Sequence, residues 1–198
     1  MTRSTALSLL ALVLVACARP IPDRATAQRG KYYREFRDYR GERCISELPL
    51  TVGFDGVEPS DFFPADVPWS QALGFPVTVA ALDGERPDLL VTLDVRPAAH
   101  PTWLASVHSE CESGRLRQTL QLYVSGDGVE TFFVVVHELG HALGVDLGCD
   151  EYGHSCAEWS VMYPRVHSLM GEWDAENPAQ WVRPADAAAL RRAWRRRH

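Results

Sequence analysis

The segment that most constrains the fold is 131–147, which reads TFFVVVHELGHALGVDL. An apolar run at 132–136 leads directly into HELGH at 137–141. Residues four apart lie on one face of an α-helix, about 6 Å apart along its axis, so a helix here places two imidazoles side by side. Gly144 permits a sharp turn afterwards, because glycine tolerates positive φ. The segment therefore predicts a buried helix that begins near Val129.

Two histidines in this arrangement can bind one metal ion, and Glu138 beside the first can reach a water molecule at that ion. The HExxH pattern is short and also occurs by chance in unrelated helices. Here Gly144 follows at a fixed interval, and SVMYP lies downstream at 160–164. The combination favours His137 and His141 as metal ligands over a chance match.

These motifs resemble the metzincin clan of zinc endopeptidases, in which HExxHxxGxxH precedes a methionine-containing turn. HELGHALGVD and SVMYP are most similar to the matrixin, or matrix metalloprotease-like, branch. The resemblance implies an α+β fold, with a mostly parallel twisted sheet, an active-site helix, a Met-turn and a C-terminal helix. It also implies one catalytic Zn²⁺, with peptide-bond hydrolysis by a metal-activated water and Glu138 as the general base.

The same resemblance assigns roles downstream of the helix. Met162 would form an apolar floor beneath the histidines, and Tyr163 and Pro164 would form a wall of the substrate pocket. The expected partner is a protein or peptide substrate, which in the family pairs with an edge strand above the metal. We expect that edge strand within 103–107.

The sequence departs from the family at the third ligand. The family places this ligand ten positions after the first histidine, where this chain has Leu147, which cannot bind zinc. Matrixins tend to run HALGxDHS, whereas here HALGVD is followed by LGCDEYG before HS resumes at His154. We therefore hypothesise that 147–153 is an insertion and that His154 is the displaced third ligand. Asp146 is the runner-up, and Asp150 is a third choice.

The N-terminus is typical of an exported lipoprotein. Residues 1–16 combine a positive residue with a short apolar run, and LVAC at 14–17 resembles a bacterial lipobox. The resemblance implies acylation of Cys17 and a lipid anchor in the bacterial envelope, with the outer membrane favoured because alanine follows the cysteine. An ordinary secretory signal is the alternative. We expect 17–43 to be a membrane tether or short N-terminal segment and 44–198 to be the metallopeptidase domain.

Four cysteines remain once Cys17 is set aside, and an even number in an oxidising compartment favours two disulfides. Three connectivities are possible. We predict a local Cys149–Cys156 bridge, which would fix the loop around His154, and a long-range Cys44–Cys111 bridge. A latency role for Cys44 is a weaker alternative.

The remaining elements follow from apolar periodicity and turn residues. Strands are predicted at 48–54, 76–82, 89–95 and 120–124. Residues 32–39 are predicted to form a short amphipathic helix, and a helix within 60–73 would turn Trp69 inward. Pro184 would start a C-terminal helix over 185–195, whose basic end at 191–198 is expected to be solvated.

Two functions from different classes remain open. A net charge of −6 gives no reason to expect a nucleic-acid partner, and a monomer is expected. One hypothesis is an active, lipid-anchored zinc endopeptidase. The other is a catalytically inactive lipoprotein of the same fold that acts as a binding or structural protein. Glu138 favours the first, because binding alone needs no general base.

Overall fold

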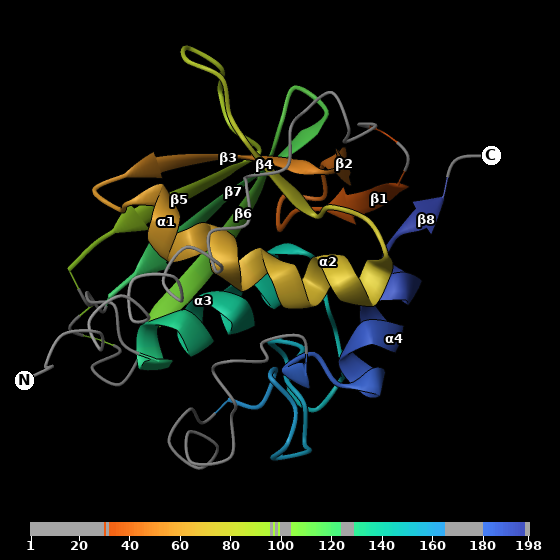
Figure 1. Cartoon of the computed structure of the whole chain (residues 1–198). Coiled ribbons are helices and arrows are strands. Elements are labelled where there is room, and N and C mark those ends of the chain that lie inside the picture. The colour runs from red at the N-terminus through yellow and green to blue at the C-terminus, as the bar shows by residue number, and fades with distance from the viewer. Residues whose placement is uncertain are drawn as a thin grey trace, which may run out of the picture.

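The computed structural model describes Gly30 and residues 32–95, 97, 99, 104–123, 129–164 and 180–196. Within these residues the chain forms an α+β unit, in which one mixed, mostly parallel sheet carries the helices on one face (Figure 1). The predicted signal segment 1–16 and the predicted lipidation site Cys17 lie outside the described residues. No helix in the described part of the chain is long and apolar enough to span a bilayer.

The strands run in the order β4-β3-β5-β7-β2-β1-β8, and β6 lies beside β7 (Figure 1). The edge strand β4 and the inner strands β3, β5 and β7 are parallel to one another, and β2 joins β7 in parallel through Ile45. The pairs β1–β2, β1–β8 and β6–β7 are antiparallel. The bounds are β1 Tyr32–Arg37, β2 Arg43–Leu48, β3 Leu50–Asp55, β4 Thr78–Ala80, β5 Leu89–Leu93, β6 Ala105–Glu112, β7 Arg115–Leu122 and β8 Arg195–Arg196.

The helices lie together on one side of the sheet (Figure 1). The described helical elements are α1 Pro59–Phe62, η1 Phe63–Asp66, α2 Val67–Leu73, α3 Val129–Ala142 and α4 Pro184–Ala193. The starts of α3 and α4 and the burial of Trp69 confirm the sequence predictions. The side chains of α3 are buried along most of its length, so the helix lies inside the molecule and not on its surface.

The amphipathic helix predicted at 32–39 is wrong, because this segment forms β1. Its backbone pairs with β2 from Tyr32 to Arg37, and Asp38 then closes the turn by accepting hydrogen bonds from the backbone amides of Arg40 and Glu42. The sheet therefore begins upstream of the domain boundary expected at residue 44.

The solvated basic end predicted for the C-terminal helix is correct for Arg191 and Arg192, which are exposed in the last turn of α4, but the helix is shorter than the predicted 185–195. Helix α4 ends at Ala193, and the chain then extends into β8, which pairs with Tyr32 and Tyr33 of β1. The edge strand predicted at 103–107 is longer than expected, because β6 continues to Glu112 and turns through Ser113 and Gly114 into β7. Its alternating charged and polar residues concealed this hairpin.

Three hydrogen bonds from distant parts of the chain fix the position of α3. The indole Nε1 of Trp69 donates to the carbonyl of Val136 at 2.8 Å. Nη2 of Arg34 donates to the carbonyl of Ala142 at 3.1 Å, and Nε1 of Trp194 donates to that of Leu143 at 2.8 Å. Each donor comes from a different segment, so the helix is held from α2, from β1 and from the end of α4.

Gly144 makes the close approach of Arg34 possible. Its φ is +72°, and a Cβ at this position would overlap Nη1 of Arg34. The guanidinium carbon also lies 5.3 Å from the ring centroid of Trp194. Only glycine satisfies both the backbone conformation and the space.

A buried carboxyl under the sheet generates a pH-dependent stability. Asp66 is 5% exposed and its Oδ2 accepts a hydrogen bond from Oγ1 of Thr78 at 2.8 Å. Burial raises the pKa of Asp66 from 3.8 to about 6. The folded state therefore binds this proton more tightly than the unfolded chain, and the associated stability is present below about pH 4 and lost as the pH rises through about 6.

We predict that Asp66→Asn removes this loss, because the amide oxygen can still accept the Thr78 bond without carrying charge. Between about pH 4 and pH 7 the variant should gain up to about 3 kcal/mol of unfolding free energy relative to the wild type. Urea unfolding of both proteins across this range measures the difference. Parallel stability curves would contradict the prediction.

Candidate metal centre

Three histidines from two segments of the chain converge beside α3. His137 and His141 come from α3, and His154 comes from the loop that follows it. The potential ligand atoms all lie within 4.8 Å of one another. The ring centroids form a nearly equilateral triangle, with sides of 4.8 Å, 5.3 Å and 4.9 Å. The insertion predicted at 147–153 thus returns the chain to the helix.

The hydrogen bonds of His137 select which of its nitrogens faces the cluster. Its Nδ1 lies 2.7 Å from the carbonyl oxygen of Val161, so Nδ1 carries the proton and donates. The lone pair therefore resides on Nε2. Nε2 of His141 lies 3.1 Å from this atom, close to the roughly 3.3 Å that separates two nitrogens of a tetrahedral zinc site. The donor set fits a metal ion.

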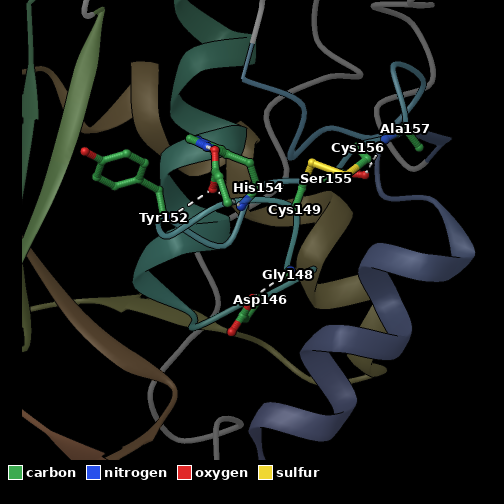
Figure 2. The surroundings of a disulfide bond; sticks show 9 residues. Asp146, Gly148, Cys149, Tyr152, His154, Ser155, Cys156 and Ala157 are labelled. Carbon is green, nitrogen blue, oxygen red and sulfur yellow. Dashed lines mark hydrogen bonds and ion pairs between the residues drawn. A yellow bond between two sulfur atoms is a disulfide. The ribbon is translucent and has the colours of Figure 1, made fainter.

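His154 is held by the loop that carries it (Figure 2). Its Nδ1 lies 2.7 Å from Oδ2 of Asp150, which leaves its Nε2 for a metal ion. The backbone amide of Cys149 donates to the carbonyl of His154. Gly148 and Gly153 adopt positive φ, at 68° and 82°, as the predicted tight path requires.

The runner-up ligands have other partners. Oδ1 of Asp146 accepts a hydrogen bond from the backbone amide of Gly148 at 2.8 Å, and its side chain points away from His154 (Figure 2). Asp150 contacts His154 and is not part of the cluster. Although burial alone would raise the pKa of Asp150, the hydrogen bonds from His154 hold it below its ordinary value.

Both predicted disulfides form. Cys149–Cys156 closes the loop that carries His154, with both cysteines at the surface (Figure 2). Cys44–Cys111 joins β2 to β6 across a sequence separation of 67. Cys44 is therefore a structural cysteine in this structure and has no free thiol.

Burial controls the protonation of the titratable side chains on α3. It lowers the pKa of His137 to about 4 and that of His141 further still, so both imidazoles are neutral at physiological pH and can each offer a lone pair. Burial also raises the pKa of Glu138 to about 8, and no described residue hydrogen-bonds its carboxyl group. A cation bound by the neighbouring histidines would stabilise the carboxylate form.

The predicted methionine turn packs directly beneath the histidine helix. Met162 is fully buried, and a Cβ on Gly140 would collide with its Sδ and lie 2.7 Å from Cζ2 of Trp69. Gly140 therefore lets the turn approach the helix between the two histidines. Tyr163 is half-buried and Pro164 is exposed at the end of this turn.

Hydrogen bonds that the sequence did not reveal secure the turn. Oγ of Ser160 donates to Oδ1 of Asp186, and it accepts from the amide of Met162 at 3.0 Å. Oδ2 of Asp186 accepts from the amide of Arg183 at the start of α4. An acidic residue two places after Pro184 was the available signal, because such residues often cap helices. This signal could not show that Asp186 also binds Ser160 of the methionine turn.

The other histidines stay outside the centre. His108 is exposed on β6 and is not part of the cluster. His100 and His167 lie outside the described residues.

No protein-family model matches this chain, and no curated protein is significantly similar to it. Its function therefore rests on the chemistry of the site.

We predict that the Cys149–Cys156 bridge sets metal affinity. The double variant Cys149→Ser/Cys156→Ser frees the loop, and fixing even one backbone residue again costs about 1–2 kcal/mol, so zinc affinity should fall at least about 5-fold. Competition with a chelating dye measures this affinity.

The second disulfide provides the matched control. Cys44→Ser/Cys111→Ser should lower the unfolding free energy by about 2–4 kcal/mol while zinc affinity of the folded protein changes less than about 2-fold. An equal loss of zinc affinity in both double variants would show that the local bridge has no special role.

Proposed function

We propose that this chain is a zinc-dependent endopeptidase, most similar to the matrixin branch of the metzincins. One observation carries the proposal. The loop after α3 returns His154 to within 4.8 Å of the HExxH histidines, despite the altered spacing. The order of sheet, histidine helix, methionine turn and C-terminal helix supports it.

The donor set favours zinc over harder cations. Imidazole nitrogens suit Zn²⁺ and its transition-metal neighbours, whereas Mg²⁺ and Ca²⁺ prefer oxygen ligands. Three protein ligands are also the usual number at a catalytic zinc, since they leave one position open. A zinc ion held here would supply Lewis acidity, polarising the scissile carbonyl and lowering the pKa of water to about 7.

Glu138 is placed for proton transfer. It directly follows His137 on α3, and its carboxyl has no competing partner among the described residues. Burial alone raises its pKa to about 8, and a cation at the neighbouring histidines would lower this pKa towards the working pH. A general base works best when its pKa lies near the working pH. Its carboxylate would take a proton from the attacking water and deliver it to the nitrogen of the leaving amine.

The substrate we propose is an extended protein segment. Strand β6 pairs with β7 and packs against α3, which places this strand next to the histidine helix. An extended peptide could add to such a strand through main-chain hydrogen bonds. Tyr163 and Pro164 would then form a wall of the pocket, as the family resemblance implies.

We also propose export to the bacterial envelope and lipid anchoring through Cys17. The two disulfides support an oxidising compartment. The LVAC sequence supports acylation.

The alternative is a catalytically inactive binding protein of the same fold. The altered ligand spacing motivates it, and the retained Glu138 argues against it. Incubating the zinc-loaded protein with an unfolded generic substrate, with and without chelator, separates the two. Cleavage that chelator abolishes supports the endopeptidase. Full zinc occupancy without cleavage favours the binding protein.

We predict that Glu138→Gln separates catalysis from metal binding. The amide is similar in shape but cannot accept the proton, so cleavage should fall about 10²–10⁴-fold. Zinc affinity should stay close to that of the wild type, because Glu138 is not a ligand. Peptide cleavage and chelator competition on the same samples provide both measurements, and undiminished cleavage would exclude Glu138 as the base.

We predict that His154→Ala lowers zinc affinity by at least about 10²-fold. Loss of only a residue that orients a ligand costs about 10–100-fold, and here the ligand itself is lost. Asp146→Ala is the matched control from the same loop and should bind zinc like the wild type. The reverse result would make Asp146 the third ligand.

A further inference from the structure

We propose that Asp150 is a positioning residue of the metal centre, which fixes the tautomer of His154 so that Nε2 faces His137 and His141. The inference deepens the proposed zinc site and rests on it. Asp150 is not one of the three converging ligands. It acts through His154 alone.

The proton on His154 is assigned by the chemistry of its partner. Oδ2 of Asp150 lies 2.7 Å from Nδ1 of His154, a short distance typical of a charge-assisted hydrogen bond. An ionised carboxylate can only accept, so Nδ1 of the neutral ring must carry the proton. The lone pair then sits on Nε2, the atom left for the metal.

The carboxylate is itself held in place. Its Oδ1 accepts hydrogen bonds from the backbone amides of Tyr152 at 3.0 Å and His154 at 3.1 Å. The carbonyl of Asp150 also accepts from the amide of Gly153 at 3.2 Å. The residue that shapes the turn therefore also aims the imidazole, and the Cys149–Cys156 bridge closes the turn around both.

The imidazoles of His137 and His154 are oriented by different kinds of partner. The backbone carbonyl of Val161 orients His137, whereas a charged side chain orients His154. A carboxylate partner raises the basicity of a ligating imidazole as well as setting its direction. Asp150 thereby compensates for a ligand that comes from a loop outside the helix.

The substitution Asp150→Asn tests this role because it reverses one hydrogen bond. The two backbone amides need an acceptor, so the amide oxygen turns to them and its NH₂ group faces Nδ1 of His154. Nδ1 must then accept, which moves the proton to Nε2 and removes the lone pair from the metal side. The matched control is Asp146→Asn, whose carboxylate lies in the same loop and accepts from Gly148 without contacting His154.

Two measurements decide the proposal. Nitrogen NMR of the His154 ring in zinc-free protein at about pH 8, where a histidine is neutral, reports the tautomer directly. Chelator competition with Zn²⁺ reports affinity. We expect the Nδ1–H tautomer in the wild type and in Asp146→Asn, and the Nε2–H tautomer in Asp150→Asn. Zinc affinity should fall about 10–100-fold in Asp150→Asn alone.

The outcomes separate this proposal from the endopeptidase. An Nε2–H tautomer in the wild type would overturn the role of Asp150 whatever the protein cleaves, as would unchanged zinc affinity in Asp150→Asn. If the tautomers and affinities follow expectation while no substrate is cleaved, the endopeptidase fails and the positioning role stands.

Discussion

The structure depends on how the C-terminal half of α3 is held. The last carbonyls of a helix have no partners within it, and here two of them, at Ala142 and Leu143, accept side-chain hydrogen bonds from Arg34 and Trp194. The positive charge of Arg34 also lies at the negative end of the helix dipole. Burial lowers the pKa of Arg34 only to about 10, so it remains charged at neutral pH. A buried cation without this helix end beside it would be costly.

This arrangement links both ends of the described fold to the candidate metal centre. Arg34 lies on β1 and Trp194 precedes β8, and these two strands pair with each other. From the other side, Asp186 at the start of α4 fixes Ser160, which in turn holds the backbone of Met162 beneath the histidines. The three histidines of the site lie close together in the sequence, whereas the hydrogen bonds that hold the surrounding backbone come from distant segments. A site with a fixed geometry requires such support.

The parts that the sequence predicted correctly are those with short-range signals. Helix α3, the start of α4 and the Cys149–Cys156 bridge follow from periodicity, a proline and close cysteine spacing. His154 could be placed because the interrupted motif resumes there. Strand β1 was mistaken for a helix because its role comes from pairing with β2 and β8, and the partner of Arg34 lies 108 positions away. Asp150 was the third choice as a metal ligand, because the sequence cannot distinguish a carboxylate that binds a metal from one that hydrogen-bonds to a histidine such as His154.

The loop closed by Cys149–Cys156 brings His154 close in space to histidines that lie 13 and 17 positions earlier in the sequence. The amide of Leu147 donates to the carbonyl of Gly153, so the segment 147–153 begins and ends at nearly one point in space. A loop closed in this way adds residues to the chain while His154 still lies beside His137 and His141. The spacing along the sequence alone does not reveal that three histidine nitrogens converge here, whereas their positions in space do.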